Sequence, residues 1–329
     1  MAARVPRRAM LFLALKASLA AVACGSAAKG AGPVATEPAL TPTPPLPTLT
    51  PLPPTPTAPP PTPTTAPQPI QLVPPQIVQG GFAMVVLNEP ATSATASFQG
   101  RQYPMLRSGQ RSWALLGVGA FAQPQLYPVN VNYTLPSGGA ATLVASLAVL
   151  DKDYPVENID LDPQTSSLLA PDIVQAELAR RATIYAGYTA QRLWSGPFVR
   201  PHAGPLSSVY GEARSYNRGP VTDYHRGNDF VGEPGTPVVA SAAGRVAFTG
   251  ELRVRGNSVI IDHGAGVFSA YHHLSRIDVG DGQAVTRGQQ VGALGATGLV
   301  TGPHLHWEVV VRGVEVDGQL WLDGREYGL

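Results

Sequence analysis

The sequence contains a single cysteine, few charged residues and no strongly basic segment. One cysteine in 329 residues excludes a framework of internal disulfide bonds. Charged residues make up 14% of the chain and the formal net charge is +1, and no basic stripe interleaved with aromatic side chains indicates a nucleic-acid partner. Hydrophobic residues nevertheless make up 44% of the chain. This predicts a folded core, and the length allows two domains with connecting segments.

Residues 1–24 lack an apolar run long enough to span a membrane permanently, but they have the features of a signal peptide. Three arginines among the first eight residues form a positive start, and the apolar stretch that follows is interrupted by Lys16. Small residues then lead to the lone Cys24, and this end resembles a bacterial lipobox, in which the cysteine is lipidated. The segment predicts export to the cell envelope or cell surface. Either a lipidated Cys24 anchors the chain to a membrane, or ordinary cleavage occurs near Ala23 or Ala27.

Residues 25–75 are dominated by proline and threonine and have almost no charge. Eighteen of the 34 prolines fall between Pro33 and Pro75, where Glu37 is the only charged residue. Such a tract cannot bury a core, so we expect a disordered linker that samples extended polyproline II. At about 3.1 Å per residue it spans up to roughly 130 Å. It would serve as a spacer that holds the folded part within reach of a cell wall, or as a passive linker.

Residues 76–151 predict a small β domain. Phe82–Leu87 and Trp113–Val118 are apolar strand candidates, and apolar and polar side chains alternate over Val129–Leu135 before a Pro-Ser-Gly-Gly turn. Short strands separated by glycine and proline over about 75 residues suggest an immunoglobulin-like β-sandwich. No catalytic cluster occurs in this stretch, so we expect a spacer or a binding module.

Residues 152–196 differ because their apolar side chains recur at helical spacing. Between residues 172 and 194 the pattern predicts an amphipathic helix, with Glu177 and Arg181 one turn apart and Gly196 beyond its end. We interpret it as a helical connector packed on a neighbouring domain, with its charges on a solvated face.

Residues 197–329 predict strands and glycine-rich turns, and six of the seven histidines lie between positions 225 and 306. The first element is His225-Arg226-Gly227-Asn228-Asp229, where an imidazole and a carboxylate four apart point to the same side of an extended segment. The second is His304-Leu305-His306, where two imidazoles share one strand face. One histidine–aspartate pair and one further histidine would supply three zinc ligands and leave a fourth position for water.

With their flanking residues, these elements resemble the lysostaphin/LytM-type zinc metalloendopeptidases over about residues 198–322. The matching stretches are Tyr210-Gly211-Glu212-Ala213-Arg214, the His225 element with Phe230, Gly235-Thr236-Pro237-Val238, Tyr271-His272-His273-Leu274-Ser275, and Thr297-Gly298 leading to Gly302-Pro303-His304-Leu305-His306-Trp307-Glu308. The resemblance implies a mainly β protein with a C-terminal antiparallel β-sheet peptidase domain. It also implies hydrolysis of peptide cross-links or stem peptides of bacterial peptidoglycan.

Carried over residue by residue, the resemblance makes His225, Asp229 and His306 the ligands of one Zn²⁺ per chain. His304 and His273 match the two histidines that lie beside the metal without binding it. Either of them can act as the general base that accepts a proton.

Three further positions follow from the same comparison. The family's oxyanion-stabilising tyrosine is assigned to Tyr216, with Tyr224 and Tyr210 as alternatives. His272 takes a variable position, and strand alternation is expected to turn it away from His273. Asn228 stands where the family usually has an apolar residue, and we expect it to face away from the metal.

Two other functions remain open on this evidence. One is a non-catalytic LytM-like module that binds peptidoglycan or activates a separate amidase. The other is a peptidase that acts on another protein, such as a glycine-rich one. Non-catalytic members generally lack some ligands, whereas all five site residues are present here.

Overall fold

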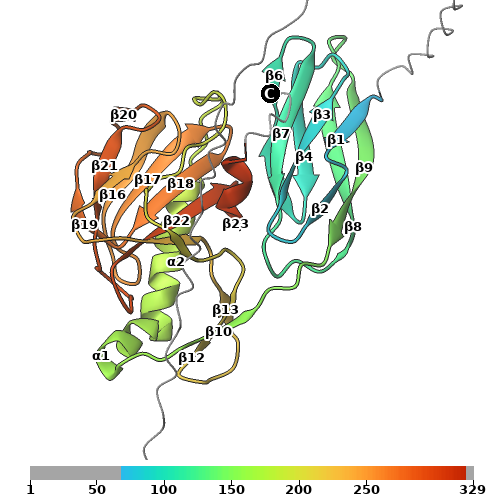
Figure 1. Cartoon of the computed structure of the whole chain (residues 1–329). Coiled ribbons are helices and arrows are strands. Elements are labelled where there is room, and N and C mark those ends of the chain that lie inside the picture. The colour runs from blue at the N-terminus through green and yellow to red at the C-terminus, as the bar shows by residue number, and fades with distance from the viewer. Residues whose placement is uncertain (1–67, 324–329) are drawn as a thin grey trace, which may run out of the picture. The chain divides into compact units, whose positions relative to one another are not determined.

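The structure is a computed structural model, and it describes residues 68–323 (Figure 1). The predicted signal peptide, Cys24 and most of the predicted linker lie outside this range. Strands dominate the described part, so the prediction of a mainly β protein is confirmed. Of the helices between residues 68 and 323, none has both the length and the apolar composition that a membrane span requires.

The β domain consists of two sheets that share one core. One sheet has the strand order β1-β3-β7-β6 and the other β2-β9-β8-β4-β5. Side chains from both sheets, such as Val85, Leu116 and Val131, form the core between them. The immunoglobulin-like character of this domain stays a prediction. The strands are β1 (Ile70–Val73), β2 (Gln76–Val78), β3 (Phe82–Leu87), β4 (Ser93–Phe98), β5 (Arg101–Pro104), β6 (Leu106–Ser108), β7 (Arg111–Gly117), β8 (Gln125–Thr134) and β9 (Ala140–Leu150).

The β domain begins earlier than the sequence analysis placed it. Strand β1 lies within the stretch predicted to be linker, and it pairs antiparallel with β3 from Ile70 opposite Leu87 to Val73 opposite Met84. It is an edge strand, where flanking prolines are tolerated because one side of the backbone needs no hydrogen-bond partner. Because prolines lie on both sides of Ile70–Val73, composition alone predicted a linker where these four residues form a strand.

Strand β3 is buried along its whole length because its sheet is covered on both faces. Val85 and Leu87 point into the core shared with the second sheet. Phe82 and Met84 pack instead into the core of the C-terminal domain, where the Phe82 and Trp321 rings stack with centroids 4.5 Å apart. A strand covered on both faces needs apolar residues at every position, which explains why this segment does not alternate.

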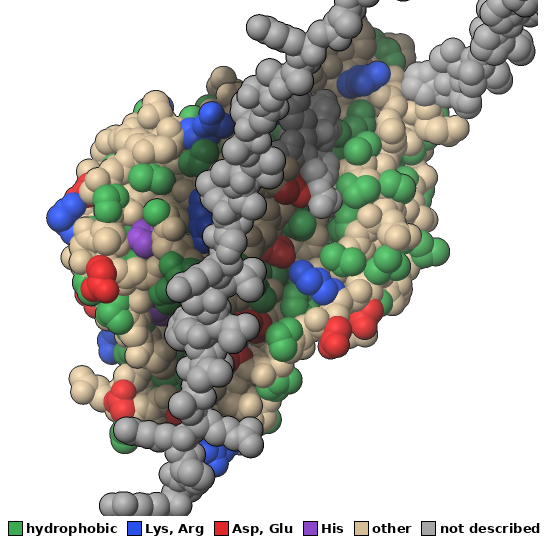
Figure 2. All heavy atoms as spheres, viewed as in Figure 1, with side chains coloured by type: hydrophobic (Ala, Val, Ile, Leu, Met, Phe, Trp, Pro, Cys, Tyr) green, Lys and Arg blue, Asp and Glu red, His purple; other side chains and the backbone are tan. Residues whose placement is uncertain are grey.

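Two strands of the second sheet of the β domain present an uncharged outer surface. Strands β8 and β9 contain no charged residue, and Leu126 and Val144 are 68% and 59% exposed. Figure 2 shows hydrophobic side chains scattered over this part of the molecule among few charges. Scattered apolar side chains are normal on a protein surface, so they indicate no site.

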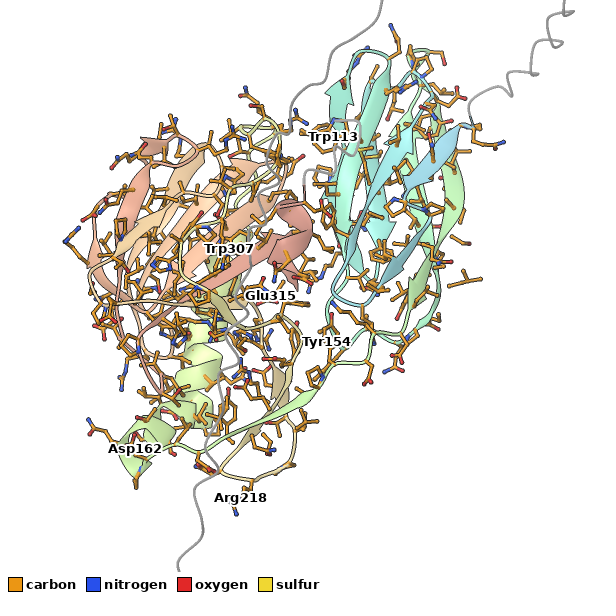
Figure 3. The ribbon with its side chains drawn as sticks, in the orientation of Figure 1. Trp113, Tyr154, Asp162, Arg218, Trp307 and Glu315 are labelled. Carbon is orange, nitrogen blue, oxygen red and sulfur yellow. The ribbon has the colours of Figure 1, made fainter. Side chains whose placement is uncertain are left out.

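The connector contains one strand and three short or medium helices. Strand β10 (Val156–Ile159) leads to α1 (Pro163–Ser166), η1 (Ser167–Leu169) and α2 (Pro171–Tyr185). The Asp162 carboxylate accepts hydrogen bonds from the backbone N–H groups of Gln164 and Thr165 and so caps α1 (Figure 3).

Helix α2 departs from the sequence prediction in two ways. It ends at Tyr185 rather than at residue 194, because the chain turns at Gly187 and continues along strand β17, where the Leu193 N–H bonds the His263 carbonyl. Its charged pair is also not on a solvated face, since Glu177 and Arg181 are both buried. The helix therefore packs this charged pair against the C-terminal domain.

The C-terminal domain, residues 197–323 of the described chain, is built on antiparallel sheets, as predicted. The main sheet has the order β11-β14-β22-β18-β17-β16-β20, with β23 beside β22, and a smaller sheet has the order β15-β21-β19. The elements are β11 (Leu206–Ser208), β12 (Ala213–Tyr216), β13 (Asp223–Tyr224), β14 (Asn228–Val231), β15 (Pro237–Val239), β16 (Gly244–Leu252), β17 (Gly256–Gly264), β18 (Val267–His272), β19 (Leu274–Ile277), β20 (Ala284–Val285), β21 (Gln290–Leu294), β22 (His304–Val311), β23 (Val314–Val316) and η2 (Gly318–Trp321).

Asn228 is fully buried on β14, and neither polar atom of its amide has a hydrogen-bond partner within residues 68–323. It lies opposite Trp307, on the face away from Asp229. Because an unsatisfied buried amide is unfavourable, Asn228→Leu is expected to raise the free energy of unfolding by about 1–2 kcal/mol. Thermal unfolding would measure this, with metal content as the control. A lower unfolding temperature would contradict the expectation.

Candidate metal centre

Two paired strands bring the central residues together. In the pairing of β14 with β22, Asp229 lies directly opposite His306, so both side chains point to the same face of the sheet. His225 lies in the short link between β13 and β14, where its backbone N–H bonds the Glu212 carbonyl and the chain then bends at Gly227. Gly227 lets this link lie close to β22, because a Cβ there would be 2.3 Å from the Trp307 carbonyl oxygen.

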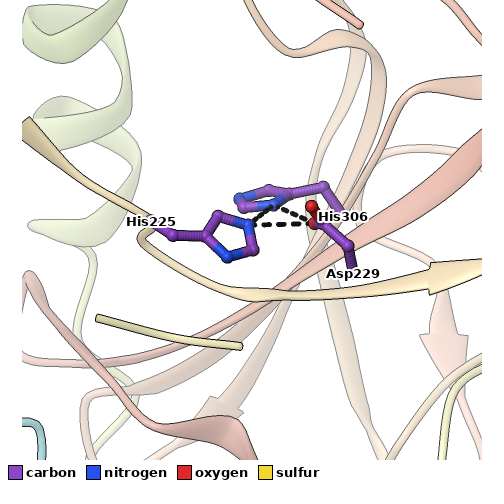
Figure 4. A group of neighbouring side chains, drawn as sticks. All are labelled: His225, Asp229 and His306. Carbon is purple, nitrogen blue, oxygen red and sulfur yellow. Dashed lines mark hydrogen bonds and ion pairs between the residues drawn. The ribbon is translucent and has the colours of Figure 1, made fainter. Parts of the chain in front are cut away.

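Three side-chain atoms converge on one point (Figure 4). His225 Nε2 lies 3.0 Å from Asp229 Oδ1 and 2.9 Å from His306 Nδ1, and these last two atoms are 2.7 Å apart. Ligands around a tetrahedral zinc ion are separated by about 3.4 Å, given zinc–nitrogen distances of about 2.0–2.1 Å. The three atoms would need to move apart by about 0.4 to 0.7 Å, a shift that side-chain rotation can supply, so this group fits a metal ion.

Hydrogen bonds on the far side of each ring fix the tautomers of the two histidines. His225 Nδ1 lies 2.8 Å from the Val209 carbonyl oxygen, and His306 Nε2 lies 3.0 Å from Glu308 Oε1. These oxygens can only accept, so each nitrogen that faces them carries the proton. The other nitrogen, His225 Nε2 or His306 Nδ1, then directs its lone pair at the shared point, as metal ligation requires.

The charge states at neutral pH suit a divalent cation. The pKa of Asp229 lies well below its usual range although burial alone would raise it, so the carboxylate is ionised. Burial lowers the pKa of His225, which keeps the ring neutral. Arg214 Nη2 lies 4.0 Å from Asp229 Oδ2, the carboxylate oxygen that does not face the two rings.

His273 and His304 lie beside the three converging side chains. Their ring centroids are 4.8 Å apart, and His304 Nε2 is 3.8 Å from Asp229 Oδ2. His273 Nδ1 donates to the Thr297 carbonyl at 2.7 Å, and His304 Nδ1 donates to the Gly302 carbonyl at 2.8 Å. In both rings Nε2 is left with the lone pair and can accept a proton. Burial, His304 and His306 together lower the pKa of His273 well below its usual range.

The backbone at the end of β18 corrects the expectation for His272. This residue is paired with His306 in the sheet, so its ring lies on the same face as the ligand set and stacks on His306 with centroids 5.7 Å apart. His273 follows with a left-handed φ of 63°. Strand alternation therefore stops at His272, and both neighbouring rings reach the same side. The His272 ring is fully buried and burial lowers its pKa to about 3.

The three candidate tyrosines differ in whether they line the cleft that contains the converging side chains. His225, Asp229 and His306 line a cleft of about 530 Å³, and Tyr216 and Tyr224 line it too. Tyr210 is fully buried outside the cleft, and its hydroxyl donates to the Glu315 carbonyl. Burial raises the pKa of Tyr216, so its hydroxyl keeps its proton and can donate a hydrogen bond.

One wall of the cleft comes from the connector, which the sequence analysis did not anticipate. Residues 157–161 line it, because β10 pairs in parallel with β12 and places Ile159 beside Tyr216. Glu157 forms an ion pair with Arg214 at 2.6 Å. The sequence gives no signal for this pairing, since β10 has only four residues and lies more than fifty positions from its partner.

Three charged residues behind His306 were also missed. Glu308 is fully buried, and its carboxylate bonds His306, Arg255 and Arg181. One signal was available, because Glu308 follows His306 by two positions on the same strand and must share its face.

Comparisons with known proteins agree with this arrangement. Residues 223–318 match the model of peptidase family M23. The crystal structure of a protein assigned to peptidase M23 from Pseudomonas aeruginosa superimposes with a TM-score of 0.56 and 30% identity, covering 76% of this chain and 96% of that one. The chain belongs to peptidase family M23. The resemblance inferred from the sequence is thereby confirmed, and the candidate metal centre lies in the M23 domain.

Curated relatives of the M23 domain include two proteins of Vibrio cholerae serotype O1. Peptidoglycan DD-endopeptidase ShyA is 50% identical over 93 residues, which are 28% of this chain and 22% of that protein. Peptidoglycan DD-endopeptidase ShyB is 36% identical over 154 residues, which are 45% of this chain and 35% of that protein. The chain thus spans about a fifth to a third of the length of these two relatives.

Proposed function

We propose that this M23 peptidase is a zinc-dependent endopeptidase that hydrolyses stem peptides or peptide cross-links of bacterial peptidoglycan. The observation that carries the proposal is the convergence of His225 Nε2, Asp229 Oδ1 and His306 Nδ1 within 3.0 Å of one another in a cleft. Two relatives are named peptidoglycan DD-endopeptidases, and this supports the substrate.

The ligand set defines what the cation would contribute. His225, Asp229 and His306 would hold one Zn²⁺ per chain, and two neutral imidazoles with one carboxylate leave the ion with a net positive charge. When bound, zinc acts as a Lewis acid that polarises a carbonyl and acidifies water. Every other function in the reaction falls to the side chains of this chain.

The remaining site residues would move protons and stabilise charge. His304 or His273 would accept a proton at Nε2 and return it to the leaving amine, because Nδ1 of each ring is already committed to a carbonyl. Tyr216 would donate a hydrogen bond to the oxyanion from the cleft wall, a contribution of about 10²-fold or more in rate.

The proposal also places the enzyme outside the cytoplasm. Peptidoglycan lies in the cell envelope, and the first 24 residues have the composition of an export signal. The proline-rich segment would then be a spacer between the folded part and the envelope. A lipidated Cys24 would anchor it to a membrane.

Mass spectrometry of defined peptidoglycan fragments tests the proposal. Incubation with the zinc-loaded protein is expected to give two products for each bond cut. The masses of the two products should together exceed the mass of the intact fragment by one water. The product masses also identify the bond, whether between D-alanine and the diamino acid, within the stem peptide, or in a bridge.

The control for this assay is Asp229→Asn, which keeps the size of the side chain but removes its charge. This variant is expected to leave the fragments intact. If the wild-type protein bound the fragments tightly and cut none of them, the non-catalytic alternative would replace the proposal.

A further inference from the structure

A buried carboxylate lies directly behind the candidate metal centre. Glu308 has no exposed surface, and its Oε1 lies 3.0 Å from His306 Nε2. Residues 306, 308 and 310 share one face of β22, and this same face is covered by helix α2, because Tyr185 packs with Val310 and Phe268. The ligand His306 and the helix are therefore joined through the side chain that lies between them.

Two guanidinium groups compensate the charge of Glu308. Arg255 donates from Nε to Oε1 at 3.0 Å, and Arg181 bonds Oε2 through Nη2. Glu308 is thus an anion that accepts from His306 and fixes its tautomer.

Helix α2 supports both of these arginines. Arg181 is itself on the helix and is only 2% exposed, and its Nη2 also bonds Glu315 Oε1 at 3.3 Å. One turn earlier, Glu177 Oε2 accepts from the Val254 N–H at 2.6 Å and holds the turn that carries Arg255. The helix lies outside residues 223–318, which match the family model.

We propose that Arg181 is a positioning residue of the metal centre: through Glu308 it holds the His306 ring with Nδ1 directed at the cation. The inference rests on the proposed function, because it assumes that His306 binds zinc. The alternative is that Arg181 only attaches the helix to the sheet. That role would affect the stability of the fold and leave zinc affinity unchanged.

Zinc affinity of the intact chain separates the two roles. Competition with a chromophoric chelator would measure zinc binding by the wild type, Arg181→Met and Arg181→Lys. Loss of a group that orients a ligand typically weakens metal binding by about 10–100-fold. We expect an effect of this size for Arg181→Met and a smaller one for Arg181→Lys, together with an altered visible spectrum of the Co²⁺-substituted protein.

The neighbouring Arg180 is the matched control, since its guanidinium lies over the Phe248 ring on the exposed side of the same helix. Arg180→Met is expected to bind zinc as the wild type does. If Arg181→Met had a lower unfolding temperature but a zinc affinity and Co²⁺ spectrum within about twofold of the control, Arg181 would be structural only, and the proposal would be wrong.

A double-mutant cycle with Glu308→Gln keeps the test decisive if Arg181→Met does not fold. The uncharged amide no longer needs a guanidinium, so Arg181→Met/Glu308→Gln is expected to fold. Its zinc affinity should equal that of Glu308→Gln alone, because residues that act through one another are not additive. A further loss in the double variant would overturn the proposal, and a wild type that binds no zinc would overturn the proposed function as well.

Discussion

Removing zinc from the purified chain is expected to abolish peptidoglycan hydrolysis, and returning it to restore the activity. The cleft contains three side-chain atoms arranged to bind a cation, from His225, Asp229 and His306. When these atoms bind the cation, none of the three side chains can act as a nucleophile. Without the ion the site has lost its strongest electrophile, and we expect a rate at least about 10³-fold lower. The loss of turbidity of purified cell walls, measured with the metal content of the same samples, checks this.

The identity of the restoring metal tests the ligand set. Two imidazoles and one carboxylate favour zinc over magnesium, which prefers oxygen ligands in an octahedron. One equivalent of Zn²⁺ should therefore restore hydrolysis and Mg²⁺ should not. Full activity in samples with far less than one metal ion per chain would refute a metal-dependent mechanism.

His306→Ala and His304→Ala are expected to fail in different ways. His306 Nδ1 is one of the three converging atoms, so its loss should remove both zinc and activity. His304 lies beside them, with its Nδ1 bonded to Gly302 and its Nε2 free for a proton. Its loss should leave one zinc per chain and lower the rate by about 10²–10⁴-fold, the range for a general acid or base. Zinc content and initial rates, measured together, distinguish the two.

His202 provides a control for replacing a buried histidine. Its ring bonds the Gly204 N–H and the Thr236 hydroxyl, and it does not line the cleft. His202→Asn is expected to keep both zinc and activity. A fully active His306→Ala variant would show that the ligands are wrongly assigned, whereas a zinc-free His304→Ala variant would make His304 a ligand.

Local spacing predicted the parts of the site that depend on one strand or one turn. His304 and His306 are two apart on β22 and share a face, as strand geometry requires. His225 and Asp229 also converge as their spacing predicted, although a bend at Gly227 separates His225 from strand β14. His272 was misplaced, since the left-handed backbone of His273 cannot be read from a histidine-histidine pair.

Contacts between distant segments could not be predicted from one sequence. The register that sets Asp229 opposite His306 joins residues 77 positions apart, and only the family resemblance suggested it. Glu177 and Arg181 showed the spacing of a solvated ion pair. They are buried instead, because their partners are the turn at Val254 and the Glu308 carboxylate.

The parallel pairing of β10 with β12 has a consequence for constructing chimeras. A transplant of residues 223–318 into another protein would carry all three proposed ligands. It would leave behind the cleft wall at residues 157–161 and the Arg181 guanidinium that contacts Glu308. A portable unit of this peptidase therefore starts no later than Val156, and a graft that starts later is expected to inherit the proposed ligands without their support.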